Sequence, residues 1–172
     1  MNWHDWSYLR SGSPEQQKVF QVLTESSVMD ILKGYDPVLC GTYPIGINIP
    51  GSDLDIICEC KSLPRFEAHI ERYFSRHEEY RSHRKKVRNT ETVIARFKFK
   101  GYKFEVFGQQ TPTKMQYAYR HMIIEHGLLK KHGDHFRQKV MALKEKGLST
   151  EEAFADILNI KGDPYEGLLD YE

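Results

Sequence analysis

Two aspartates separated by one leucine, Asp53-Leu54-Asp55, constrain this chain more than any other stretch. They stand at the head of an apolar run that predicts a β-strand, and residues two apart in a strand point to the same face. Two carboxylates on one face cannot both stay ionised cheaply in a dry site, and a pair of divalent cations is a common remedy. The sequence therefore predicts a metal site on this strand.

The segment before the aspartates suits a phosphate group. Val38-Leu39-Cys40 predicts a short strand, and Gly41-Thr42 then turns the chain into a short helix. Free backbone N–H groups at the start of a helix bind anions, and Thr42 adds a hydroxyl donor. The two segments together predict a combined metal and phosphate site.

The motif Gly41-Thr42, Gly46 and Ser52-Asp53-Leu54-Asp55 resembles the nucleotidyltransferase superfamily of the DNA polymerase beta type. Small members of that superfamily carry Gly-Ser, a Gly four residues on, and then Ser-Asp-Leu/Ile-Asp. The chain is also similar to the minimal nucleotidyltransferases of bacteria and to an uncharacterised bacterial family of short proteins with the same blocks. The resemblance covers about residues 13–107, and it departs from many minimal members at Ile45, where they have an Arg.

A β-hairpin is predicted from Thr92 to Phe107, because apolar residues there recur every second position around Gly101. Glu105 is a carboxylate on the mostly apolar second strand. The resemblance implies that Glu105 is the third metal-coordinating carboxylate, on the sheet face that helices leave uncovered. The alternative left open is that Glu105 is a solvated partner of Lys103 or Arg96.

The resemblance also implies a role for each residue of the site. The catalytic and metal-binding residues are Asp53, Asp55 and Glu105, and the cofactor is Mg²⁺, as one ion or a pair. The expected substrate-binding residues are Gly41, Thr42, Ser52, Arg96 and Lys98.

Helical periodicity predicts a helix that begins at Ser13, with a capping box to Gln16, and further helices over about residues 64–77, 113–129 and 134–146. Thr113 is the expected cap of the third, with Gln116 as its partner. A last helix opens at Ser149, and Gly162-Asp163-Pro164 is expected to end regular structure. The histidines of this region, which are expected at the surface or an interface, are His121, His126, His132 and His135.

The expected fold class is α+β, nucleotidyltransferase-like, with a small mixed sheet, helices on one face and a C-terminal helical extension. Residues 1–107 would form the core with an N-terminal arm, and residues 108–172 the extension packed on it. A basic segment over residues 76–88 is either a phosphate-binding patch or a charged edge strand or loop that discourages sheet pairing.

Charge and composition limit the partners. The 25 Lys and Arg against 24 Asp and Glu leave a net charge of +1, which gives no long-range attraction to nucleic acid or anionic membranes. Nucleic acid is therefore not expected as a partner, and no membrane span or signal peptide is predicted. The three cysteines are expected as reduced core thiols, and the protein as cytoplasmic.

The resemblance implies an enzyme that transfers a nucleotidyl group from a nucleoside triphosphate to an unknown acceptor, a small molecule or a protein. Two alternatives stay open. A non-catalytic or weakly active nucleotide-binding module, acting through a protein partner, is suggested by Ile45 and the short chain. A hydrolase of nucleoside polyphosphates would use the same metals with water as acceptor.

Overall fold

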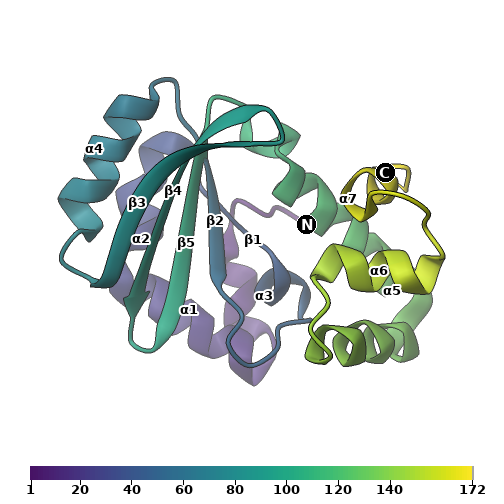
Figure 1. Cartoon of the computed structure of the whole chain (residues 1–172). Helices are drawn as coiled ribbons and strands as arrows, with labels where there is room; N and C mark the ends of the chain where they lie inside the picture. Colours follow the sequence, from purple (N-terminus) through teal and green to yellow (C-terminus); the bar gives the residue numbers. More distant parts are fainter. Residues whose placement is uncertain (172) are drawn as a thin grey trace.

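A five-stranded mixed sheet forms the centre of the chain in a computed structural model, which describes residues 1–171 (Figure 1). The strand order is β1-β2-β5-β4-β3, and β2 and β5 run parallel while the other neighbours are antiparallel. The strands are β1 (Val38–Cys40), β2 (Leu54–Glu59), β3 (Glu78–Val87), β4 (Thr90–Phe99) and β5 (Tyr102–Gln109). This architecture confirms the predicted α+β class.

Helices lie on one face of the sheet and beyond its β1 edge (Figure 1). The α-helices are α1 (Pro14–Ser26), α2 (Val28–Leu32), α3 (Thr42–Ile45), α4 (Leu63–Phe74), α5 (Tyr117–Glu145), α6 (Thr150–Leu158) and α7 (Pro164–Leu169). Three short 3-10 helices are η1 (Trp6–Ser11), η2 (Lys33–Tyr35) and η3 (Thr113–Met115).

The two faces of the sheet belong to two hydrophobic clusters. Leu54 and Ile56 are fully buried in a cluster with residues of α1, α2 and α4. Ile57 points the other way and joins a second cluster with residues of α5, α6 and α7. The opposite face is thus covered at its β1 end by the C-terminal helices, so the side chain of Asp55 projects toward them.

Local sequence signals set the first helix and the hairpin as predicted. Ser13 and Gln16 form the capping box of α1, and Ser27 breaks α1 from α2 with a φ of 54°. Gly101, with a φ of 81°, lies in the turn between β4 and β5. The basic segment forms the edge strand β3, which confirms the alternative of a charged edge strand.

The start of α5 differs from the prediction. The Thr113 hydroxyl donates to the carboxylate of Asp36, and Gln116 takes the N-cap position of α5 without a side-chain cap bond. The Gln116 side-chain amide donates instead to the backbone oxygens of Cys58, at 3.0 Å, and Thr111, at 2.9 Å. The backbone oxygens of Cys58 and Thr111 need hydrogen-bond donors. Gln116 supplies them, so it does not form the predicted capping box with Thr113.

One further helix prediction is confirmed and another is wrong. The two helices expected on either side of Gly133 are separated by a kink within α5, where Gly133 has a non-helical φ of 73° and ψ of −164°. Regular structure does not end at Gly162-Asp163-Pro164, because Asp163 caps α7 and Pro164 occupies its first turn.

Two further observations concern the cysteines and the helices. Cys40, Cys58 and Cys60 are buried free thiols, as predicted. Within residues 1–171, no helix combines the length and apolarity needed to cross a lipid bilayer.

Candidate active site

Gly41 brings the start of α3 against the carboxylate of Asp55. It precedes α3 with a φ of 74° and a ψ of −146°, a conformation that L side chains rarely adopt. A Cβ atom at Gly41 would lie 2.3 Å from Asp55 Oδ2. Glycine is therefore required here by both the backbone and the contact, and Thr42 begins the helix as predicted.

Strand register places Asp55 beside Glu105. The two residues are partners in the parallel pairing of β2 and β5, and neighbouring strands lie about 4.8 Å apart. Asp53 precedes β2 and stands two positions before Asp55, on the same side by alternation. The structure thus pairs Asp55 with Glu105 across neighbouring strands and places Asp53 just before β2.

Crowding of carboxylates shifts the ionisation of Asp55. Burial, together with the charges of Glu105, Asp53 and Glu151, raises the pKa of Asp55 to about 8, and Lys144 acts in the opposite direction. The protonated form of Asp55 is therefore favoured near neutral pH, and a cation bound beside it would displace that proton.

Asp53 carries a buried oxygen that lacks a partner. Its Oδ1 is enclosed yet makes no hydrogen bond among the described residues. A buried unpaired carboxylate oxygen is costly, and a coordinated cation would satisfy it. Asp53 and Asp55 therefore fit a site for a hard cation such as Mg²⁺.

Glu105 has a competing contact. Its carboxylate accepts a hydrogen bond from Arg96 Nε, as the alternative expected, but it is only 12% exposed and therefore not solvated. Within residues 1–171, no group of three or more His, Cys, Asp or Glu side chains is already arranged to hold a metal ion. The contact occupies Oε2 of Glu105, so a cation beside Asp53 and Asp55 would compete with Arg96 for this carboxylate.

Arg96 and Lys98 lie close to the carboxylates. Both line a pocket of about 240 Å³ together with Asp53, and Lys98 forms an ion pair with Glu79. Ser52 is different, because its Oγ accepts the backbone N–H of Ile49 at 3.0 Å and so holds the loop before β2.

Another arginine approaches the position where Ile45 replaces the expected Arg. Ile45 is 4% exposed and belongs to the core. Arg137, from α5, donates to the backbone oxygens of Ile45 at 2.8 Å and Gly46 at 2.9 Å. The guanidinium therefore ties α5 to the end of α3 and does not stand in the position of the missing arginine.

The C-terminal helices add ionisable groups that the sequence reading missed. Glu125 is 3% exposed, and burial together with the charge of Glu151 raises its pKa to about 8, while Lys144 acts in the opposite direction. Burial lowers the pKa of Lys144, whose Nζ donates to Thr150 Oγ1 at 2.8 Å. The only sequence signal for Glu125 is its position among apolar residues of the helix, such as Ile124.

His121 is buried, so the prediction of a surface histidine is wrong for this residue. It is 3% exposed, and its Nε2 lies 2.8 Å from the backbone oxygen of Tyr165. Its Nδ1 lies 3.7 Å from a carboxylate oxygen of Glu151. The unpredicted helix α7 covers this histidine, which is why the sequence alone placed it outside.

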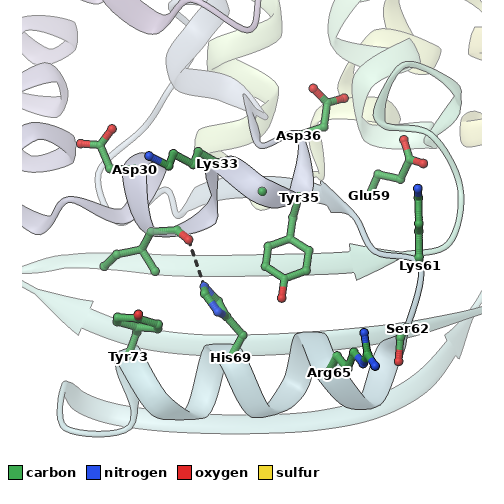
Figure 2. A pocket seen from close by; sticks show the side chains of 12 residues that line it. Asp30, Lys33, Tyr35, Asp36, Glu59, Lys61, Ser62, Arg65, His69 and Tyr73 are labelled. Atoms are coloured by element: carbon green, nitrogen blue, oxygen red, sulfur yellow. Dashed lines mark hydrogen bonds between the residues drawn. The ribbon is translucent and has the colours of Figure 1, made fainter.

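Two other pockets differ in their relation to the carboxylates. A pocket of about 300 Å³ is lined by Ile57 and Phe107, which follow Asp55 and Glu105 by two positions each. A larger pocket of about 970 Å³ lies between η2 and α4, where Figure 2 shows Tyr35 above α4. None of the three site carboxylates lines the larger pocket, so its size does not mark the active site.

Sequence comparison gives a family without an assigned activity. The model of the family described as Domain of unknown function (DUF4269) matches residues 21–171. No curated protein matches the sequence.

Solved structures show which fold this is. The polymerase core of TRAMP, an RNA surveillance complex, has a TM-score of 0.56 at 15% identity, over 96% of this chain and 58% of that chain. Cid1, with RNA terminal uridylyl transferase activity, has a TM-score of 0.55 at 10% identity, over 82% and 46%. The GLD-2/RNP-8 complex has a TM-score of 0.52 at 12% identity, over 95% and 79%.

The likeness is one of fold. This chain spans 58% of the TRAMP chain and 46% of the Cid1 chain, roughly half of each. The sheet with its helices shares the architecture of these neighbours.

Proposed function

We propose that this chain, which belongs to the family described as Domain of unknown function (DUF4269), is a metal-dependent nucleotidyltransferase. It would transfer a nucleotidyl group from a nucleoside triphosphate to an acceptor. The observation that carries the proposal is the pairing of Asp55 with Glu105 across parallel strands, with Asp53 beside them and Gly41 in contact. The shared fold supports the class of reaction.

Asp53 and Asp55 are the residues that would hold Mg²⁺, with Glu105 as a third ligand. Bound there, Mg²⁺ would neutralise and orient the triphosphate. The unpaired Oδ1 of Asp53 and the raised pKa of Asp55 support this assignment, because a cation would relieve both.

The remaining site residues have roles that follow from their positions. Backbone N–H groups at Gly41 and Thr42 would donate hydrogen bonds to phosphate oxygens, and Arg96 and Lys98 would counter further negative charge. Ser52 would contribute indirectly, because its hydroxyl holds the loop that precedes Asp53. An acceptor oxygen would bond to the α-phosphorus as its proton leaves, and the bond to pyrophosphate would break.

The acceptor is a small molecule, a protein or RNA in this proposal. RNA is included as a possible acceptor class because one solved neighbour is described by RNA terminal uridylyl transferase activity and another belongs to an RNA surveillance complex. The net charge of +1 supplies no long-range attraction, so any RNA contact would rest on local groups such as Arg96 and Lys98.

Two organisational points belong to the same proposal. Residues 1–107 would be the catalytic unit and residues 108–172 the helical extension, a division that falls two residues before the end of β5 at Gln109. The free thiols support a reducing compartment such as the cytoplasm.

A second candidate is a nucleotide-binding module without catalysis. The ion pair between Arg96 and Glu105 favours it, because Glu105 is then engaged away from a metal. Such a module would bind triphosphate and leave it intact.

The test is transfer of label from each α-labelled nucleoside triphosphate in the presence of Mg²⁺, with a cell extract and with single-stranded RNA as acceptors. The wild-type protein should transfer label and release pyrophosphate, and Asp55→Asn should not. Asp30→Asn, an exposed aspartate, is the matched control and should behave as the wild type. Triphosphate that binds and remains intact with every acceptor would favour the second candidate.

A further inference from the structure

The pocket of about 300 Å³ begins next to the proposed metal site. Ile57 of β2 and Phe107 of β5 form its sheet side, and they are the next residues on the same face after Asp55 and Glu105. Its volume is at the small end of ligand pockets and suits a ligand the size of a nucleoside.

Aromatic side chains line this pocket. Phe107, Tyr117 and Tyr165 contribute rings from β5, α5 and α7. The guanidinium carbon of Arg88 lies 4.6 Å from the ring centre of Tyr165 and 5.4 Å from that of Tyr117. Flat rings stack favourably on such surfaces, so the lining suits a planar heterocycle.

Two of the donor side chains around the pocket, Arg88 and Tyr117, already bind carboxylates. Arg88 donates to Asp163 at 3.1 Å and to Glu166 at 2.9 Å. The Tyr117 hydroxyl donates to Glu166 at 2.9 Å. A ligand therefore finds few free donors from these two residues.

The amide orientation of Gln109 follows from its neighbours. Thr92 Oγ1 donates to the backbone oxygen of Thr90 at 2.9 Å, so it can only accept from Gln109 Nε2, at 2.8 Å. This bond fixes the orientation of the amide and commits one of its two N–H groups, so the side-chain carbonyl oxygen of Gln109 can accept from a ligand.

Gln116 and Glu151 extend the same pattern. Both N–H groups of the Gln116 amide are committed to the backbone oxygens of Cys58 and Thr111, which leaves its side-chain oxygen as an acceptor. Glu151 lines the pocket with a carboxylate. The polar groups that this pocket offers are therefore mainly acceptors.

We propose that this pocket binds the base of a nucleotide and selects bases that carry an exocyclic amino group. This inference rests on the proposed function for its link to a triphosphate. An amino group can donate to the side-chain oxygens of Gln109 and Gln116. A carbonyl oxygen at the same ring position cannot donate, and its lone pairs repel those of the two side-chain oxygens. Adenine is therefore favoured over hypoxanthine, and cytosine over uracil.

Nucleosides test the pocket without metal, triphosphate or catalysis. Ligand-observed NMR titrations in EDTA should show adenosine binding about fivefold or more tightly than inosine. Cytidine and uridine differ by the same exchange of an amino group for a carbonyl group, so cytidine should bind more tightly than uridine.

Two neighbouring glutamines provide a matched pair of variants. Gln109→Leu should lower the preference for adenosine over inosine, because only the Gln116 oxygen would then remain to accept from the amino group. Gln110→Leu should keep the wild-type ratio, because the Gln110 amide donates to Lys61 O outside the pocket. Tyr165→Leu should weaken both nucleosides and leave their ratio in place. Melting temperatures of all variants show whether each is folded.

The outcomes separate the two proposals. Inosine binding as tightly as adenosine, or a ratio that Gln109→Leu does not change, would overturn this inference and leave nucleotidyl transfer standing. A strong adenosine preference in a protein that consumes no triphosphate would support the base pocket and count against the proposed enzyme.

Discussion

Asp55 shows how one side chain links ionisation to stability. A carboxyl group whose pKa is raised on folding, here from 3.8 to about 8, binds more protons in the native state than in the unfolded state between those values. Its contribution therefore lowers the free energy of unfolding as pH rises from about 4 to about 8, at about 1.4 kcal/mol for each pH unit at most.

Asp55→Asn should remove this penalty. In EDTA, the variant should be more stable than the wild type at pH 8 by a few kcal/mol, and the difference should shrink toward pH 4. Denaturant unfolding at pH 4, 6 and 8 measures it, with Asp30→Asn as the control for loss of an exposed aspartate. Parallel pH profiles for the wild type and Asp55→Asn would contradict the buried cluster.

Gly41 is the second residue on which the site depends. Gly41→Ala should lower stability by about 1–3 kcal/mol and disturb Asp55, because the added Cβ meets Oδ2 at 2.3 Å. Gly133→Ala is a close control, since Gly133 has a φ of 73° with open space around it. If thermal unfolding shows equal losses for both variants, the backbone conformation alone explains Gly41.

At the scale of elements, some features were readable from the sequence and others depended on docking. Alternation along each strand predicted the faces of Asp53, Asp55 and Glu105. The parallel register of β2 and β5 is a non-local contact, and no local pattern encodes it. Gly162-Asp163-Pro164 fits both the end of structure and the start of a helix, and contacts across the fold favour the helix.

Helix α7 is tied to the turn between β3 and β4 by Arg88, which pairs with Asp163 and Glu166. Arg88→Gln should cost about 1 kcal/mol and speed hydrogen exchange in α7, because partly exposed ion pairs and ring contacts each contribute modestly. Lys86→Gln is the control, since Lys86 pairs only loosely with Glu91, at 3.9 Å. If hydrogen exchange in α7 is the same in Arg88→Gln and in the wild type, the other contacts of α7 are enough to hold it in place without Arg88.

For the whole molecule, the carboxylates lie between two unlike pockets on one sheet face. Asp53 lines the pocket with Arg96 and Lys98 on one side, and the aromatic pocket opens beyond Asp55 and Glu105 on the other. Buried groups of α5 and α6 close the site, and their positions depend on how the C-terminal helices dock. Sequence periodicity could predict those helices, but not which of their charges would be buried.

Binding of Mg²⁺ and triphosphate should therefore stabilise the entire fold, and this stabilisation should require Asp55. A ligand at 100 times its dissociation constant adds about 2.7 kcal/mol to the free energy of unfolding. The wild-type melting temperature should rise when Mg²⁺ and triphosphate are added together, and rise less with either alone, because phosphate and carboxylates share the cation.

Asp55→Asn should lose this joint response, since an amide keeps the shape of the side chain and removes a charge that would hold Mg²⁺. Asp30→Asn should retain it. A nucleotide-binding module without catalysis would show a rise in melting temperature with no pyrophosphate released, and its response would persist in Asp55→Asn if the cation is not needed. A wild-type protein that responds no more than Asp55→Asn would mean that the proposed metal site does not exist.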